Sequence, residues 1–421
     1  MASYWNPAAL GRQTSNAHGV AIPFGIHAAL TGNVIEGAND LEALKNSAAV
    51  PTDAQINAAL NKIDQPGSGL RVDGDIGVVT KAGRLSIFVN GTVDAGAVPQ
   101  VDRVNTAAAN IQNGTNNSKL IVRGANIAEF GAAYGREIDP LPGLYLGGAL
   151  KLMSANVGYV DYFVLRENND EGNIVSKLKD GSRRSANIGV DAGLLWDLDR
   201  SFGGVALKPR LGLVGRNLNN PSFKQPDAAI AAGYADKFKV NPQVRLGASL
   251  QPFNWWNLAA DMDLTRNLTL VNAGSRQLGV GSEFNVFNRS WINIPLRVGL
   301  RRNVDETSAG TMLTLGAGLN FLHVMFDASA AVSNKRTTLQ SQGEQKKTPR
   351  EAAVGFQLSV LFGGSDEEPA APSREWKAAP PPADYQPAPT SVIKNADKAH
   401  EDLKVEELKK AGETKPTTTR P

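Results

Sequence analysis

The chain has 421 residues, with 44 basic and 41 acidic side chains and no cysteine. A formal charge of +3 gives no electrostatic basis for nucleic-acid binding, and the absence of cysteine excludes disulfides, thiol catalysis, zinc ribbons and iron–sulfur clusters. Hydrophobic residues make up 42% of the chain, yet no run approaches the roughly 18 apolar residues that a transmembrane helix requires. A helical membrane protein is therefore excluded.

Alternation of apolar and polar side chains with a period of two recurs along most of the chain. It is clearest in residues 311–319 (TMLTLGAGL) and 354–362 (VGFQLSVLF). In the second segment Val, Phe and Leu take one face and Gly, Gln and Ser take the other, because successive strand side chains point to opposite sides. Such segments, separated by turns, are typical of a transmembrane β-barrel.

Fourteen segments of this kind are about as long as a tilted strand needs to cross the hydrocarbon core. Long polar connections tend to alternate with short turns, as extracellular loops and periplasmic turns do. The pattern predicts an all-β, antiparallel barrel of about 14 strands over residues 19–362, in a bacterial outer membrane and with periplasmic termini. The predicted strands are 19–31, 69–80, 84–96, 118–135, 143–166, 185–197, 204–217, 241–251, 256–266, 277–287, 292–303, 310–320, 323–334 and 351–362.

The longest connection, residues 33–67, contains two helix patterns. The segment NDLEALKNSA offers Asn39 as an N-cap, and PTDAQINAALNKI offers Thr52 or Asp53. We expect two short helices over or inside the outer mouth of the barrel. They would serve either as surface decoration or as a gate or plug.

With the apolar faces toward lipid, the opposite faces line the lumen. The register is strongly set, because a basic residue at the lipid midplane costs roughly 2 to 4 kcal/mol. Charges of both signs are then interspersed in the lumen. A ring of charges of a single sign, which would select anions or cations, is not found in this pattern. A closed, salt-bridged interior is the simplest interpretation; charges that only brace the wall, or that line a polar conduit, are the alternatives. The predicted inward residues are Arg71, Asp73, Asp75, Arg84, Arg123, Glu129, Lys151, Asp191, Lys208, Arg210, Gln243, Arg245, Ser249, Asp261, Asp263, Glu283, Arg297, Arg301 and Asp327.

Motifs for catalysis and for metal or cofactor binding are not found. There is no P-loop, GxSxG or HExxH sequence, and the four histidines are scattered. Asp261 and Asp263 share a face and could bind a cation, but nearby inward arginines favour structural pairing. We expect neither enzyme activity nor a cofactor.

The two ends of the chain differ from the barrel. The start, MASYWNPAAL, has no charged region followed by an apolar stretch, so we expect that a secretory signal is missing from it. After Phe362 the alternation stops, and nine of the 23 prolines follow. We predict that residues 363–421 form a disordered periplasmic tail, either solvated or docking a partner.

Several segments carry a family resemblance. WNPAAL at residues 5–10 resembles the NPA element of the long-chain fatty-acid transporter superfamily, whose fourteen-stranded barrels carry an N-terminal hatch in the lumen. IVRGANIAEFGAAYGR from Ile121, RLGLVGRNLNNPSF from Arg210 and NLAADMDLTRN from Asn257 resemble outer-membrane TraF-type proteins, named for plasmid conjugal transfer. The resemblance implies a hatch remnant at residues 1–18, with the hatch motif Asn6, Pro7 and Ala8, and places the family's recurring charged positions at Arg123, Glu129, Asp261, Asp263, Glu283 and Arg297. Together with Arg245 and Arg301, which the alternation also places inside, these residues form the predicted lumen charge network.

Two classes of function remain open at this point. One is a non-conducting component or scaffold of a conjugation apparatus, with envelope proteins bound through the tail. The other is a passage, either for hydrophobic or amphipathic small molecules or as a general polar porin. Outer-membrane lipid is the expected surrounding, no nucleic-acid partner is expected, and the residues do not specify a small-molecule ligand.

We predict that deleting residues 363–421 leaves membrane insertion unchanged, because Phe362 ends the last strand with the aromatic residue that commonly closes such barrels. Heat-modifiable gel migration of protein folded into liposomes measures this. Loss of the folded band in the truncated chain would show that the tail contributes to the barrel.

Overall fold

The computed structural model describes residues 5–12, 18–65, 68–163, 165, 174–271, 274–289, 291–341 and 344–362, and for residues 339–341 and 344–345 the backbone alone. The predicted tail, residues 363–421, lies outside the described residues. No helix in the described part of the chain is long and apolar enough to span a membrane.

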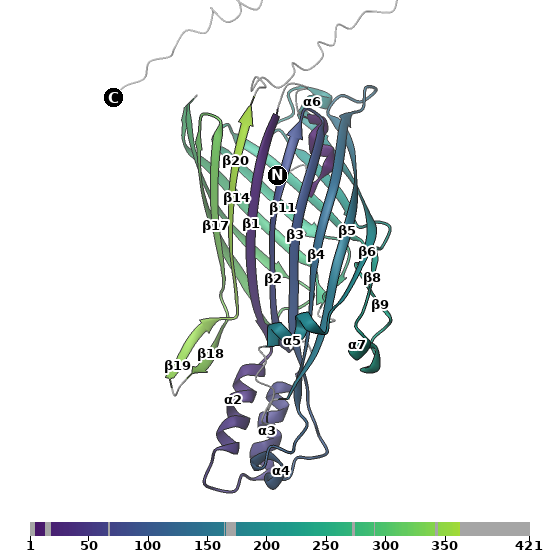
Figure 1. Ribbon diagram of the computed structural model, residues 1–421. Coiled ribbons are helices and arrows are strands. Elements are labelled where there is room, and N and C mark those ends of the chain that lie inside the picture. The colour runs from purple at the N-terminus through teal and green to yellow at the C-terminus, as the bar shows by residue number, and fades with distance from the viewer. Residues whose placement is uncertain are drawn as a thin grey trace, which may run out of the picture. The chain divides into compact units, whose positions relative to one another are not determined.

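Fourteen antiparallel strands form a closed barrel (Figure 1). Each strand pairs with its neighbours in the chain order of the barrel strands, and β1 pairs with β20, so that no edge is left open. All fourteen predicted strands are confirmed. They are β1 (His18–Thr31), β2 (Gly69–Ala82), β3 (Leu85–Gln100), β4 (Lys119–Glu137), β5 (Leu144–Phe163), β6 (Arg183–Asp197), β7 (Arg210–Arg216), β10 (Gln243–Phe253), β11 (Trp256–Asp263), β14 (Gln277–Arg289), β15 (Ile292–Asn303), β16 (Thr311–Phe321), β17 (Val324–Ser333) and β20 (Glu351–Phe362).

Two strand boundaries correct the sequence prediction. β7 begins at Arg210 and not at residue 204, because the chain turns there with positive φ at Leu207 and Lys208. Lys208 is exposed in this turn and does not line the lumen. Arg84 is likewise exposed, in the tight turn between β2 and β3. Both residues were counted as inward only because the strands were extended too far.

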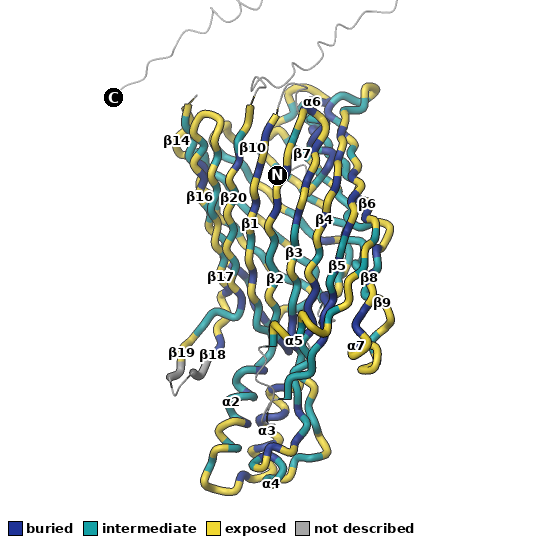
Figure 2. The backbone as a smooth tube through the Cα atoms, viewed as in Figure 1, coloured by how far each residue is buried: buried dark blue, intermediate teal, exposed yellow. Residues whose placement is uncertain are grey.

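Exposure alternates along the strands, as Figure 2 shows. The exposed rows are Val, Leu, Ile and Phe side chains, for example Ile76, Leu152 and Leu315. A barrel with an apolar outer band and a polar interior is the form in which β-structure crosses a membrane, since every backbone group is paired within the wall.

The two ends of the barrel differ in their connections. β1 starts and β20 ends at the same end, where His18 pairs with Phe362, and the turns at this end include the short connections after β2, β10 and β16. Long loops lie at the other end, which is therefore the extracellular one. Phe253, Trp255, Trp256 and Phe284 stack with ring centroids 5.4 to 6.4 Å apart at the periplasmic end, where an aromatic belt is expected.

Shorter elements lie outside the barrel wall or within its lumen. They include three two-stranded sheets, several short helices and one 3-10 helix. The sheets pair β8 (Ser222–Lys224) with β9 (Lys237–Lys239), β12 (Asn267–Leu268) with β13 (Gly274–Ser275), and β18 (Arg336–Ser341) with β19 (Glu344–Pro349). The helices are η1 (Pro7–Arg12), α2 (Val34–Lys45), α3 (Asp53–Ile63), α4 (Ala108–Gln112), α5 (Ile174–Asp180), α6 (Leu198–Phe202) and α7 (Asp227–Ala231).

The two predicted helices in the first long loop are α2 and α3. Thr52 caps α3 through a reciprocal box with Gln55, as the sequence indicated. The proposed cap of the first helix was wrong: α2 begins at Val34, after Asn33, so Asn39 lies within it. The start was missed because Gly37 disfavours a helix, and here it lets α2 approach α3, since a Cβ would lie 2.5 Å from a side-chain carbon of Ile63.

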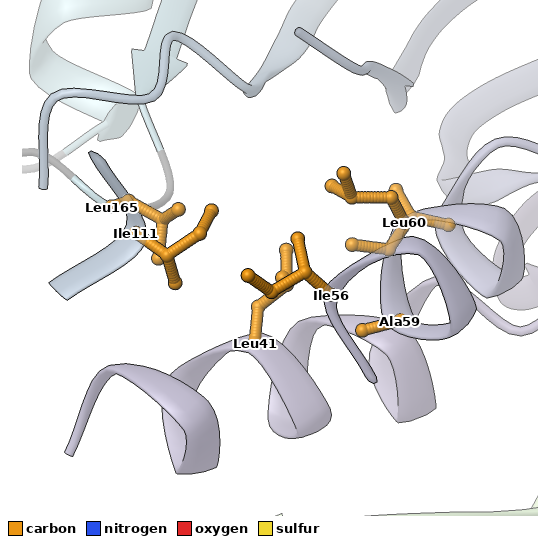
Figure 3. Close-up of a cluster of buried hydrophobic side chains, with 7 residues drawn as sticks. Leu41, Ile56, Ala59, Leu60, Ile111 and Leu165 are labelled. Carbon is orange, nitrogen blue, oxygen red and sulfur yellow. The ribbon is translucent and has the colours of Figure 1, made fainter. Parts of the chain in front are cut away.

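α2, α3 and α4 form a separate helical cap at the extracellular end (Figure 1). Its core is Leu41, Ile56, Ala59, Leu60, Ile63, Ile111 and Leu165, of which six are labelled in Figure 3. None of the residues of α2 and α3 lines either of the two large cavities of the barrel. The helices therefore do not lie inside the lumen, which corrects the plugging alternative.

We predict that Ile56→Ala loosens the cap and spares the barrel. Truncating a fully buried Ile costs about 2 to 5 kcal/mol, and Ile56 contacts the cap's own core. Hydrogen exchange of residues 33–65 should rise, while heat-modifiable migration stays unchanged. Asn57→Ala on the exposed side of α3 is the control, because Ala is a strong helix former. Loss of the folded barrel in Ile56→Ala would contradict the independence of the cap.

Candidate functional site

The inner wall of the barrel is the candidate functional site, and its charged side chains pair locally. Lys151 on β5 is fully buried, with its Nζ 3.2 Å from Glu129 Oε1 on β4 and 3.1 Å from Asp191 Oδ2 on β6. Arg216 on β7 lies 3.8 Å from Glu129 and 3.9 Å from Asp191. Two carboxylates and two cations thus form one neutral cluster, as burial of charge requires.

A second set of pairs lies on the opposite wall. Glu283 on β14 and Arg297 on β15 are direct cross-strand partners, and their side chains meet at 2.7 Å. Arg297 also reaches Asp327 on β17 at 2.5 Å. It can do so because Gly316 and Gly318 of the intervening strand β16 leave the wall flat: a Cβ at Gly318 would lie 2.6 Å from Asp327 Oδ1.

Arg245 and Asp263 form the third pair among the predicted residues, between β10 and β11. Arg245 Nε donates to Asp263 Oδ1 at 2.7 Å, and the buried Asp263 also accepts from Gln243 and from the backbone N–H of Gln277. Arg301 donates to Gln277 Oε1 at 3.0 Å. Asp261 lines the cavity next to this group and forms no ion pair with a described residue.

Arg123 does not join an ion pair with a described residue, although the sequence placed it in the network. Its guanidinium bonds to the carbonyl of Leu270 and to the Gln225 side chain, and it lies 4.1 Å from the ring centroid of Tyr234. All three partners belong to the extracellular loops 217–242 and 264–276. Arg123 thereby fixes two loops against the inner face of β4, which sequence pattern does not reveal because loops carry no periodicity.

The same loops insert apolar side chains into the extracellular half of the lumen. Phe223 and Leu270 are buried against Met153, Ala155 and Val157 on the inner face of β5. This buried cluster fills the space in front of β4 and β5. The loops, and not the predicted helices, therefore cover this part of the lumen.

The hatch motif is seated on a row of glycines at the periplasmic end. Gly135 on β4, Gly147 on β5 and Gly193 on β6 are paired in register. A Cβ at Gly147 would lie 2.3 Å from the carbonyl carbon of Pro7, and one at Gly193 would lie 2.0 Å from Asn6 Oδ1. The row thus gives residues 6–8 a flat surface on which to lie.

Hydrogen bonds and packing hold the motif in place. Asn6 Nδ2 donates to the carbonyl of Leu194 at 3.2 Å, and the Ala8 N–H donates to Asn6 Oδ1 at 3.0 Å. Leu10 is buried among Val79, Phe88, Ala133 and Ala149 of the wall. The ring of Trp5 lies 5.1 Å from the Arg216 guanidinium, so the hatch residues touch the buried charge cluster.

Two large adjoining cavities lie in the lumen. One of ≈ 1220 Å³ is lined by hatch residues Trp5 and Asn6 and by charged groups that include Asp75 and Arg301. The other, of ≈ 860 Å³, is lined by Glu283, Arg297 and Asp327 and by no hatch residue. The cavities share lining residues, among them Arg210, Ser249 and Thr314, so they meet inside the barrel.

Sequence reasoning missed one inward histidine. His27 on β1 lies between two carboxylates, with Nδ1 2.9 Å from Asp73 and Nε2 2.7 Å from Glu351. Its position opposite Asp73 in the β1–β2 register was available from the alternation, but histidines were considered only as a group. No cluster of three metal-ligating side chains occurs among the described residues.

A closed antiparallel barrel with an apolar exterior and a polar, charged lumen defines an outer-membrane β-barrel protein. The family model for "F plasmid transfer operon, TraF, protein" matches residues 3–263. The chain belongs to this family, which confirms the resemblance of its motifs to TraF-type proteins. No curated protein sequence matches the chain.

Solved structures with a similar fold include three proteins, each aligned over 86% of this chain and 93% of its own length. They are the toluene transporter TbuX of Ralstonia pickettii (12% identity, TM-score 0.45), the toluene transporter TodX of P. putida (11%, 0.43) and a FadL homologue of Pseudomonas aeruginosa (12%, 0.42).

We predict that Gly147→Ala releases the hatch, because the new Cβ would overlap the backbone of Pro7 and Ala8. The chain lacks cysteine, so a single Leu10→Cys reporter measures the release as faster maleimide labelling, by at least about tenfold. Gly148→Ala is the matched control, since a Cβ there meets nothing closer than 3.7 Å. Equal labelling in both variants would show that the glycine row does not seat the hatch.

Proposed function

We propose that this protein is a non-conducting outer-membrane component that supports a conjugal-transfer apparatus in the envelope. The observation that carries the proposal is the neutral, buried cluster of Lys151, Glu129, Asp191 and Arg216 between the hatch and the inserted loops. A lumen occupied by paired charge is a poor path for a hydrocarbon or an acyl chain, because an apolar solute gains nothing from such walls. The family's operon name supports the link to conjugation.

Two separate closures support the non-conducting state. The hatch residues pack against the glycine row at the periplasmic end, and loops 217–242 and 264–276 are fixed by Arg123 at the extracellular end. Both lie against β4 and β5. A solute that passed along this wall would have to displace structure at two levels.

A second candidate function is the passage of small polar solutes. It is favoured by the ≈ 860 Å³ cavity, which contains no hatch residue and which joins the larger one. This cavity is lined by Glu283, Arg297 and Asp327, whose charges suit polar solutes and not hydrocarbons. Passage along this wall would leave the closures on β4 and β5 in place.

Conductance separates the two candidates. We expect planar bilayers containing the wild-type protein to show no steady current. Arg123→Ala combined with Gly147→Ala should produce channel openings, because Leu270 and Gln225 lose their common anchor and the hatch loses its seat. Arg123→Lys in the same Gly147→Ala background keeps the charge but cannot hold both partners in a fork, so it should open less often. A large, steady current in the wild type would replace the proposal by the polar passage.

Conjugation frequency tests the biological role. A donor strain lacking the gene should transfer its plasmid less often, and the full chain should restore transfer. Proteoliposomes should show no uptake of a long-chain fatty acid or of toluene above that of empty liposomes. Normal conjugation in the deletion strain, together with uptake of either apolar compound, would overturn the proposal.

A further inference from the structure

Three neighbouring strands end their lipid-facing rows in arginine at the extracellular side. On β15 the outward row of Val298 and Leu300 continues to Arg302, and on β14 the row of Val280 and Leu278 continues to Arg276. On β11 the row ends at Leu264, and Arg266 follows two residues later. The last leucine of each row, Leu264, Leu278 and Leu300, is 50%, 38% and 49% exposed, so each faces the surrounding lipid.

The register confirms that Arg276 and Arg302 are neighbours on the outer face. Leu278 pairs with Arg302, and the ladder continues where the Val304 N–H donates to the carbonyl of Arg276. Arg276 and Arg302 are therefore diagonal cross-strand neighbours, with side chains about 7 to 8 Å apart at their bases. One phosphate group fits between two guanidinium groups at that spacing.

Arg266, Arg276 and Arg302 form a cluster with three positive charges. The described residues around the cluster neutralise only one of them. Arg266 is paired with Asp305, Nε to Oδ2 at 2.6 Å. Neither Arg276 nor Arg302 has a carboxylate partner among the described residues, and Arg276 Nε is buried without a hydrogen-bond partner there. Like charges side by side on a sheet destabilise it unless an anion is bound.

The height of the cluster matches the head groups of the outer leaflet. Trp256 at the start of β11 and Trp291 in the turn before β15 mark the periplasmic belt. Arg302 follows Trp291 by about ten residues along β15, which spans roughly 25 Å of barrel height at about 3.3 Å per residue and a tilt of about 40°. That distance equals the apolar band of an outer-membrane barrel, so the guanidinium groups lie at its outer border.

Uncharged positions border the cluster on both sides. The flanking strands β10 and β16 carry Val244 and Thr311 at the ends of their outward rows. Arg184 ends the outward row of β6 elsewhere on the barrel, where it bonds to Ser154. Three adjacent arginines therefore distinguish this part of the wall.

We propose that Arg266, Arg276 and Arg302 form a binding site for the phosphate groups of an outer-leaflet glycolipid, the lipid A of lipopolysaccharide. Arginine holds phosphate through paired hydrogen bonds, while the leucines below contact the acyl chains. Asp305 orients Arg266 and neutralises its charge, so the net positive charge of the site comes from Arg276 and Arg302. This site lies on the outside of the wall and does not depend on what the lumen does.

Native mass spectrometry of detergent-solubilised full-length protein tests the proposal, with bis-phosphorylated lipid A as the probe. We expect the wild type to retain lipid A and Arg276→Gln/Arg302→Gln to bind at least about tenfold more weakly. Arg276→Lys/Arg302→Lys keeps the charge and should lie between them. The matched control, Arg136→Gln/Arg289→Gln, removes two exposed arginines outside the cluster and should bind as the wild type does.

Two further experiments test whether the bound phosphate belongs to the lipid. Dephosphorylated lipid A should bind the wild type no better than Arg276→Gln/Arg302→Gln. Inorganic phosphate alone should not raise the Tm of the wild type. Equal retention by all variants, equal loss in the control, or stabilisation by inorganic phosphate alone would overturn the assignment. Heat-modifiable migration verifies that every variant is folded before binding is compared.

Discussion

Each side chain of a strand in this wall can face only lipid or lumen, and the rest of the structure depends on this constraint. Charges that strands carry in the apolar band must point inward, because lipid does not solvate them. Once inside, they lie on a crowded inner surface and need partners of opposite sign. The pairing of Arg245 with Asp263, and of Glu283 with Arg297, follows directly. Both pairs join adjacent strands, so each also fixes the register of its strands.

Glycine residues leave space on that inner surface for the side chains and segments that pack against it. Lys151 lies between Gly131 and Gly189 of the flanking strands, where any larger side chain would compete for its space. Gly135, Gly147 and Gly193 serve the hatch in the same way. Small residues here provide room for other groups rather than backbone freedom, since these positions are in ordinary strand conformation. The abundance of glycine in the chain thus reflects a lumen filled by side chains and loops.

The alternation of apolar and polar residues predicted the strands and the direction in which their side chains point, because both depend on local periodicity. All fourteen strands follow from it, as does the inward side of Arg297, because a one-residue slip would expose the charges to lipid. It could not predict where strands stop, which misplaced Arg84 and Lys208, since turns obey backbone conformation and not polarity. The partners of Arg123 were also out of reach, because Gln225 and Leu270 come from loops whose path is set by distant packing.

The inner face of β4 and β5 carries the inserted loops, the charge cluster and the hatch in order from the extracellular to the periplasmic end. Arg123, Glu129 and Gly135 lie six residues apart on the inward row of β4, and they hold the extracellular loops, the charge cluster and the hatch. Among the described residues, the opposite wall from β14 to β20 presents its own side chains and lines the smaller cavity. The structures that we propose as closures are thus anchored to two long strands on one side of the barrel. A conformational change that displaced the hatch or the loops would act on that wall, whereas the smaller cavity lies along Arg297 and its two carboxylates.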